Sequence, residues 1–151
     1  LKLPGLESRI RALCCLAPAT EPFVGRKAFH EGELPFEDSI ETLILAARDD
    51  VLVDLETSIQ PLYSRLGPRA RLEIIDDADH FHFCDGIEVL HKMHENTPRP
   101  GLGSKPRSGQ ELKDEEQMHA LLCERVTRFF AESFSAESGR VRRPADSVCI
   151  T

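Results

Sequence analysis

The sequence contains no apolar run long enough to cross a membrane and no excess of positive charge. A membrane-spanning helix needs about 20 consecutive apolar residues, and the chain has neither such a run nor a signal-peptide pattern at its start. The formal net charge is −7, which removes the electrostatic attraction on which nucleic-acid binding depends. We therefore expect a cytoplasmic protein with neither a membrane nor a nucleic acid as its partner.

Cysteine pairs with the spacing of a metal or redox site are also missing. None of the 5 cysteines forms a C-x-x-C pair, and their number is odd. Cys14 and Cys15 are adjacent in an apolar segment, where cysteine behaves as a small buried hydrophobe. We expect a reducing compartment and no disulfide framework.

Three short runs are typical of strands, over 10–17, 42–47 and 71–75, and the third is shorter and partly alternates between polar and apolar residues. The first two are apolar at consecutive positions, which is typical of strands buried on both faces of a parallel sheet. Segments with helical periodicity follow the second and third runs. Strands that alternate with helices predict an α/β fold, and we expect a three-layer α/β/α arrangement around a parallel sheet.

The segment after the second run predicts a helix with clear limits. Asp54 can cap its start, and Gly67 in a left-handed conformation, followed by Pro68, should end it. Its apolar residues recur at spacings of three or four: Leu55, Ile59, Leu62, Tyr63 and Leu66. We expect this stripe to pack against the sheet.

Two further helices are predicted in the second half of the chain. Asp85, with Glu88 three residues later, can cap a helix that runs to about Glu95. Ser108 with Glu111 offers another helix start by the same pattern. The long helix that follows has one apolar face, formed by Met118, Leu121, Leu122, Val126, Phe129, Phe130 and Phe134.

Two connections are rich in polar residues, proline and glycine, at 19–39 and 96–109. We expect the first to be a lid or one short helix near a site, and the second to be a mobile surface connection. The length suits a single domain. We place that domain at 1–136 and a flexible polar tail at 137–151.

An acid and a histidine stand just past the ends of the second and third runs. Asp50 follows LILAARD, and His80 follows EIIDDAD. Because sites in parallel sheets form beyond the carboxyl ends of the strands, we expect these two side chains to meet. A carboxylate that accepts one ring N–H of a histidine leaves the other nitrogen free to act as a general base.

Three segments resemble the last third to half of an α/β-hydrolase. The A-x-x-D segment at 47–50 resembles the family's strand followed by G-x-x-D, which supplies the acid of the catalytic triad. The D-A-D-H-F segment at 77–81 resembles its G-x-G-H-x-x-F, which supplies the histidine, and the helix at about 111–135 resembles its closing helix. The resemblance implies the C-terminal part of an α/β-hydrolase fold, similar to dienelactone hydrolases or small esterases. It further implies that His80 is the general base, that Asp50 is the acid, and that the substrate is a small-molecule ester or acyl compound.

The family's glycines are replaced in this chain. Ala47 stands where the family has the glycine before the acid, and Asp77 and Asp79 stand where it has the two glycines before the histidine. Aspartate tolerates left-handed backbone better than most residues. The G-x-x-D spacing favours Asp50 over its neighbour Asp49 as the acid, and we interpret Asp49 as a solvated turn carboxylate.

The family's nucleophile motif is not in the sequence. Neither G-x-S-x-G nor G-x-C-x-G occurs, the chain starts at Leu1, and its first methionine is Met93. We expect these residues to be the C-terminal fragment of a serine- or cysteine-type hydrolase whose nucleophile precedes Leu1. The fragment alone should be inactive, because its acid and histidine have no nucleophile to activate.

Two other interpretations stay open. His80-x-His82 and His91-x-x-His94, with Cys84 nearby, permit a small zinc-binding module. This spacing matches no well-defined zinc signature, so we expect neither a metal nor another cofactor. The second alternative is a hydrolase-like domain that binds a partner or ligand without catalysis.

Overall fold

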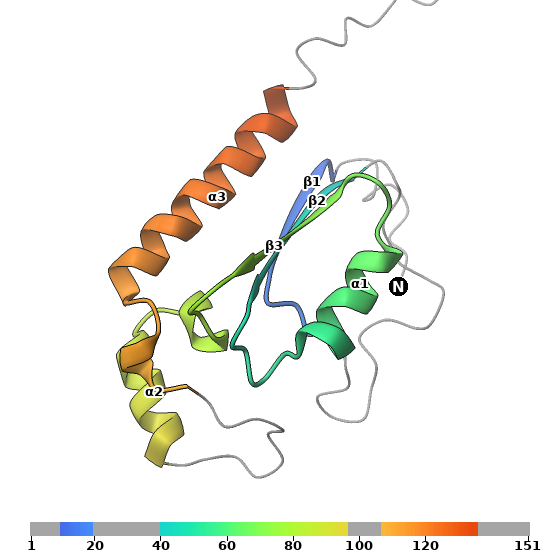
Figure 1. The fold of residues 1–151 in the computed structure, drawn as a ribbon. Coiled ribbons are helices and arrows are strands. Elements are labelled where there is room, and N and C mark those ends of the chain that lie inside the picture. Colours follow the sequence, from blue (N-terminus) through green and yellow to red (C-terminus); the bar gives the residue numbers. More distant parts are fainter. Residues whose placement is uncertain (1–9, 20–39, 97–106, 136–151) are drawn as a thin grey trace, which may run out of the picture.

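The computed structural model describes residues 10–19, 40–96 and 107–135 (Figure 1). Nearly all of the two connections and the whole of the tail discussed above lie outside these residues. The described elements are β1 (Ala12–Leu16), β2 (Glu41–Ala47), η2 (Leu55–Ile59), α1 (Gln60–Arg65), β3 (Ala70–Ile75), η3 (His80–Phe83), α2 (Ile87–Asn96), η4 (Gly109–Glu111) and α3 (Glu115–Ser135).

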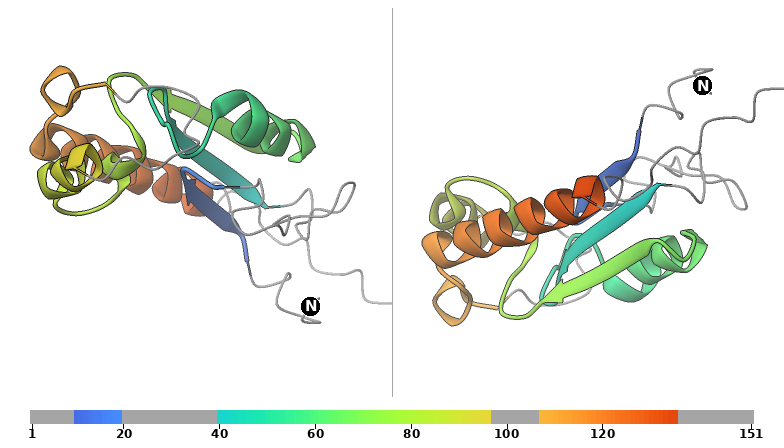
Figure 2. Two further views of the ribbon diagram at one scale, coloured as in Figure 1. Left: turned by 90° about the horizontal axis from the view of Figure 1, so that it is seen from below. Right: turned by 90° about the horizontal axis from the view of Figure 1, so that it is seen from above.

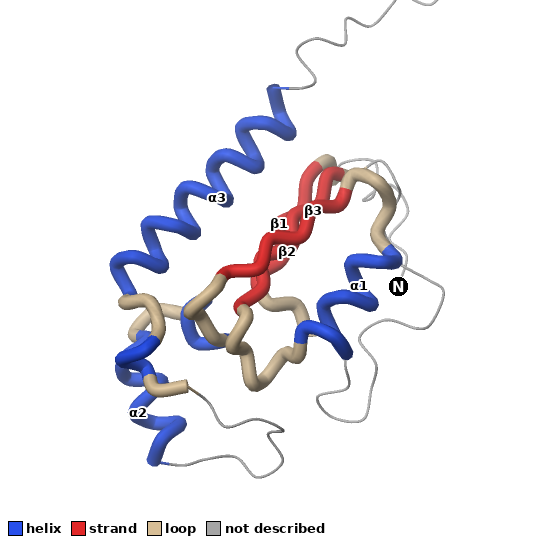
Figure 3. Tube along the Cα trace, in the orientation of Figure 1, coloured by secondary structure: helices blue, strands red, loops and turns tan. Residues whose placement is uncertain are grey.

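The three strands form one parallel sheet in the order β1-β2-β3 (Figure 3). In register, Ala12 pairs with Glu41 and Ala47 pairs with Ile75. The central strand β2 is buried along nearly its whole length, which agrees with its continuous apolar sequence. The predicted α/β class and the parallel sheet are therefore confirmed.

Alternate side chains of β2 enter two different hydrophobic clusters, because successive residues of a strand point to opposite faces. Leu43 and Leu45 join a cluster with Met118 and Phe129 of α3. Ile44 joins a cluster that also contains Ile59 and Leu62, from η2 and α1. The central strand thus links α3 to α1, and Figure 2 shows these helices from two sides.

The helix predicted after β2 begins as expected but is divided in two. Asp54 caps it, because its Oδ1 accepts hydrogen bonds from the backbone N–H groups of Glu56 and Thr57. The first turn, η2, is a wide π-helical turn, and the α-helix starts anew at Gln60 with a proline in its first turn. Proline is favoured at helix starts because it has no N–H to donate.

The predicted left-handed glycine at the end of this helix is wrong. The helix ends at Arg65, and Leu66 leaves it in an extended conformation with ψ 141°. Gly86 is the only described glycine with positive φ, at 73°, so Gly67 does not adopt the left-handed conformation. Extended backbone at Leu66 already turns the chain away from the helix, and no left-handed residue is needed there.

The predicted capping of α2 by Asp85 is also wrong. The Asp85 side chain is fully exposed, and the first N–H groups are bonded by a residue from another helix. The Glu115 carboxylate accepts hydrogen bonds from the N–H groups of Gly86 and Ile87, both at 3.2 Å. A carboxylate favours this position because a helix N-terminus carries partial positive charge.

The long helix α3 starts later than the sequence indicated. Ser108 caps only the short 3-10 turn η4, and α3 begins at Glu115, where Asp114 accepts a hydrogen bond from Gln117 N–H at 2.8 Å.

No described helix is both long enough and apolar enough to cross a membrane. The four described cysteines, Cys14, Cys15, Cys84 and Cys123, are free thiols, as predicted.

Candidate active site

Asp50 is fixed in the turn that follows β2. Its side chain is only 2% exposed, and its Oδ1 accepts hydrogen bonds from the backbone N–H groups of Leu52 and Val53, both at 2.8 Å. Aspartate forms such bonds to the N–H groups two and three residues ahead in tight turns. One carboxylate oxygen is thereby committed to the backbone, and the other, Oδ2, is left for another partner.

That partner is His80, which lies in η3 after β3. Its Nδ1 is 2.9 Å from Asp50 Oδ2, so the predicted contact between the two residues is confirmed. An ionised carboxylate only accepts hydrogen bonds, so Nδ1 carries the hydrogen and Nε2 of the neutral ring holds the lone pair. Among the described residues, Nε2 has no hydrogen-bond partner, and the side chain is 31% exposed.

The carboxylate also changes the protonation of the ring. The hydrogen bond that His80 donates to Asp50 raises the pKa of His80 above its usual value, while burial works in the opposite direction. The negative charges of Asp50 and Asp79 add to the upward shift. This arrangement stabilises the imidazolium that forms when Nε2 takes up a proton.

Asp49, which we expected to be solvated, contacts an arginine. Its Oδ2 lies 3.1 Å from the Arg107 guanidinium, which also binds Asp77 Oδ1 at 2.8 Å and the Glu111 carbonyl oxygen at 3.0 Å. Asp49 is therefore part of an ion-pair network and not a purely solvated carboxylate. Arg107 joins the turn after β2 to the turn after β3, and these two turns carry Asp50 and His80.

The two aspartates of the turn before His80, Asp77 and Asp79, adopt different backbone conformations. Asp77 has φ 53°, the left-handed conformation that glycine adopts most easily and that aspartate tolerates. Asp79 has φ −122° and ψ −172°, an extended conformation open to any residue. Only Asp77, of these two aspartates, thus adopts the backbone conformation that favours glycine.

Asp79 forms a second acid–histidine cluster, which the sequence reading missed. Its Oδ1 lies 2.7 Å from His82 Nδ1 and accepts a hydrogen bond from Phe81 N–H at 2.9 Å, while its Oδ2 lies 2.8 Å from His91 Nε2. His82 Nε2 is 2.9 Å from the Lys113 carbonyl oxygen. An aspartate three residues before a histidine in a turn was the available signal, but the partner on α2 was not visible in the sequence.

Burial and hydrogen bonding have opposite effects on the pKa values of Asp79 and His82. Burial penalises the charge on Asp79, but the bonds and charges of His82 and His91 outweigh it and lower the pKa of Asp79. Burial likewise opposes protonation of His82, but its bonds to Asp79 and to the Lys113 carbonyl raise the pKa of His82. For both residues, the hydrogen bonds and neighbouring charges of the cluster thus outweigh the effect of burial.

The histidines of the alternative zinc-binding module do not all converge. His82 and His91 come together, whereas the ring of His94 packs against Phe81 with centroids 5.4 Å apart. Cys84 is exposed and is not part of the described cluster. The set that does converge contains Asp79, which the sequence analysis considered only as a replacement for glycine.

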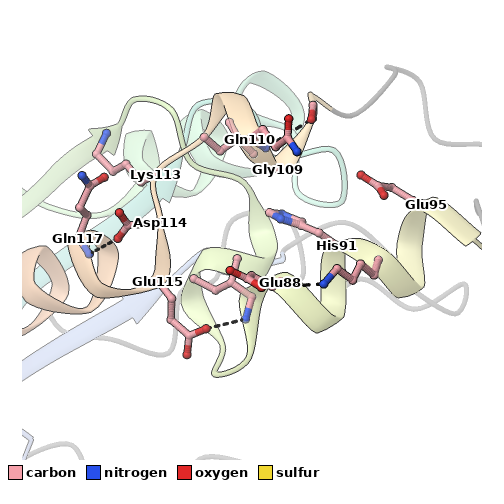
Figure 4. Close-up of a pocket in the computed structure, with 13 residues that line it drawn as sticks. Glu88, His91, Glu95, Gly109, Gln110, Lys113, Asp114, Glu115 and Gln117 are labelled. Carbon is pink, nitrogen blue, oxygen red and sulfur yellow. Dashed lines mark hydrogen bonds and ion pairs between the residues drawn. The ribbon is translucent and has the colours of Figure 1, made fainter.

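A hollow of about 610 Å³ lies between α2, η4 and the start of α3. His91, Glu95, Gly109, Gln110 and Lys113 are among its lining residues (Figure 4). Neither Asp50 nor His80 lines it. The hollow therefore adjoins the second acid–histidine cluster and not the first.

No family model, curated protein or solved structure matches this chain. The family resemblance therefore stays a prediction from short sequence segments. The site is defined by its own geometry, which is a buried carboxylate, a half-exposed imidazole and a hydrogen bond of 2.9 Å between them.

Proposed function

We propose that Asp50 and His80 are the acid and the histidine of a nucleophile–histidine–acid triad in a hydrolase of ester or related acyl bonds. The observation that carries the proposal is the 2.9 Å contact between His80 Nδ1 and Asp50 Oδ2. The opposite oxygen of Asp50 is held by two backbone N–H groups. A carboxylate fixed in this way keeps the ring in one orientation and one tautomer, which is the function of the acid in such a triad.

The chemistry follows from the position of the lone pair on Nε2. His80 takes a proton from a serine or cysteine nucleophile as that group attacks the carbonyl carbon, and Asp50 stabilises the imidazolium that results. His80 then returns the proton to the departing alkoxide, and the acyl group stays on the nucleophile. A water molecule, deprotonated by the same nitrogen, cleaves the acyl intermediate.

The fold supports the proposal in its coarse features. The element order, the parallel sheet and the two clusters on β2 are compatible with a three-layer α/β/α arrangement, the C-terminal part of an α/β-hydrolase. Both proposed residues follow neighbouring strands at their carboxyl ends, where sites in such sheets form. The left-handed conformation of Asp77, where the family has glycine, adds support from the local backbone.

The proposal requires a nucleophile that the described residues do not supply next to His80. The chain contains no nucleophile motif, and among the described residues no hydroxyl or thiol is hydrogen-bonded to His80. The absence of a nucleophile motif also favours a second candidate, a hydrolase-like binding domain without catalysis. The two candidates differ in whether the protein forms an acyl intermediate.

The test uses the protein produced from its complete reading frame. We expect it to hydrolyse short p-nitrophenyl esters and to be labelled by a fluorophosphonate or by a thiol-directed acylating probe. The His80→Gln variant should lose at least a thousandfold in kcat, because general-base catalysis and triad geometry are both removed. His119→Gln makes the same chemical change on the exposed surface of α3 and should leave kcat unchanged.

Two results would overturn the proposal. Full ester hydrolysis by the His80→Gln variant would show that the histidine is not the base. A complete protein that is neither labelled nor active on any ester of the series would favour the non-catalytic candidate.

A further inference from the structure

We infer that Asp79, His82 and His91 form a binding site for one divalent transition-metal ion of the zinc type. Three potential ligand atoms, a carboxylate oxygen of Asp79 and one ring nitrogen from each histidine, all lie within 4.8 Å of one another. They come from two elements, the turn that begins η3 and the helix α2. Imidazole nitrogen and carboxylate oxygen are ligands that zinc accepts.

The orientation of His82 is already that of a metal ligand. Its Nε2 lies 2.9 Å from the Lys113 carbonyl oxygen. A carbonyl only accepts hydrogen bonds, so Nε2 must carry the hydrogen. Its Nδ1 lies 3.0 Å from the Asp79 backbone nitrogen, whose N–H points at it, and 2.7 Å from Asp79 Oδ1, and this Nδ1 is the potential ligand atom. Histidines that bind metals characteristically give their other N–H to a backbone carbonyl or carboxylate, which fixes the tautomer and the ring orientation.

The position of His91 is fixed from two sides. Its Nε2 is 2.8 Å from Asp79 Oδ2. On the other side of the ring, a Cβ atom placed on Gly109 would lie only 2.6 Å from His91 Nδ1. The absence of a side chain at Gly109 therefore lets η4 approach the ring of His91 closely (Figure 4).

The contacts of Asp79 with the two histidines are somewhat shorter than the ligand spacing of a tetrahedral site. Zinc bonds to nitrogen and oxygen are about 2.0–2.2 Å long, which places tetrahedral ligand atoms about 3.4 Å apart. Asp79 Oδ1 lies 2.7 Å from His82 Nδ1, and Asp79 Oδ2 lies 2.8 Å from His91 Nε2. Each ring and the carboxylate would have to separate by about 0.6–0.7 Å to admit an ion between them.

Burial selects the kind of ion. The side chains of Asp79 and His82 are 5% and 0% exposed, whereas His91 is 13% exposed and lines the hollow. Solvent can therefore reach the ion from one side only, which leaves room for one exchangeable ligand such as water. Four-coordinate binding suits zinc, whereas magnesium and calcium require six or more oxygen ligands.

The site shares no ligand atom with Asp50 and His80 of the proposed triad. The ion would join the turn that carries His80 to α2, which is now linked to that turn by hydrogen bonds and ring contacts. The competing explanation of the cluster is a hydrogen-bond network that binds no metal.

The test uses the protein produced from its complete reading frame, purified without a histidine tag and stripped with a chelator. We expect calorimetric titration with Zn²⁺ to give one ion per chain, and Co²⁺ to show the intense visible absorption of a tetrahedral site. His91→Gln should abolish stoichiometric binding, because it removes the ligand that is most exposed and least needed for packing. His94→Gln on the same helix is the matched control and should bind as the parent does.

A measurement on the unaltered chain protects the test against misfolded variants. Zn²⁺ should slow the carbethoxylation of His91 by diethylpyrocarbonate, measured by peptide mass spectrometry, and should leave His94 as reactive as before. It should also raise the midpoint of thermal unfolding, because an ion that binds only the folded state stabilises it. Absence of stoichiometric binding by the parent, or unchanged binding by a folded His91→Gln variant, would overturn the inference.

Discussion

Replacing Asp50 by asparagine should reverse the hydrogen-bond pattern of His80. The Oδ1 position accepts two backbone N–H groups at 2.8 Å, and only the carbonyl oxygen of asparagine can replace it there. The amide NH₂ must then occupy the position of Oδ2 and face His80 Nδ1. Because an NH₂ group only donates, Nδ1 must accept, and the hydrogen of the neutral ring moves to Nε2.

The magnitude follows from the bond that is lost. A hydrogen bond between charged groups contributes about 1.5–3 kcal/mol, and this bond is the largest cause of the raised pKa of His80. The pKa of His80 should therefore fall in the Asp50→Asn variant. A raised pKa contributes stability fully below the unfolded-state value of 6.5 and loses it as the pH rises through the folded-state value. The variant should thus lose more unfolding free energy at about pH 5.5 than at about pH 9.

The assay is nitrogen-15 NMR of the histidine rings combined with urea unfolding at the two pH values. Asp49→Asn is the matched control, since it makes the same change one residue earlier, where the carboxylate binds Arg107 and not His80. In the complete enzyme, the wrong tautomer should lower kcat by roughly 10⁴-fold, as the corresponding change does in a serine protease. A ring that keeps its hydrogen on Nδ1 and its titration midpoint in the Asp50→Asn variant would refute the reasoning.

Three further predictions concern packing, capping and thiol chemistry. Phe129→Ala should lower the unfolding free energy, measured by urea titration, by about 3–5 kcal/mol, because the Phe129 residue is 2% exposed. Phe134 is 54% exposed, so Phe134→Ala should change the unfolding free energy by less than about 0.5 kcal/mol. Glu115→Gln should cost about 1 kcal/mol, since one of the two N–H groups that it caps would face an NH₂ group; an unchanged midpoint of thermal unfolding would contradict this. Burial raises the pKa of the Cys14 thiol to about 11, so iodoacetamide at about pH 8 should alkylate exposed Cys84 much faster, and equal rates in peptide mass spectrometry would disprove it.

Local sequence signals predicted the sheet and the start of the first helix well. The runs that became β1, β2 and β3 were placed to within about two residues, because the chain of a central parallel strand must be apolar on both faces. Asp54 was predicted as a cap and is one, since capping depends on N–H groups two or three residues away. The contact between Asp50 and His80 followed from the order of the strands and was also predicted correctly.

Local signals failed where the partner came from another element. α2 is capped by Glu115, which is 28 and 29 residues away from the N–H groups that it binds, and the nearby Asp85 was chosen in its place. The same reason explains Arg107, whose guanidinium joins two turns that are distant in sequence. In the sequence, nothing distinguishes Glu115 and Arg107 from the other charged residues.

The amino-acid sequence by itself determined the strands, the alternation with helices, and the positions of Asp50 and His80, because periodicity and short-range capping are properties of neighbouring residues. Only the tertiary structure decided that His91 of α2 meets Asp79 and His82. That meeting depends on the direction in which α2 leaves the turn after η3 and on the close approach of Gly109 to His91. Such geometry is set by how whole elements pack, and no spacing along the chain encodes it.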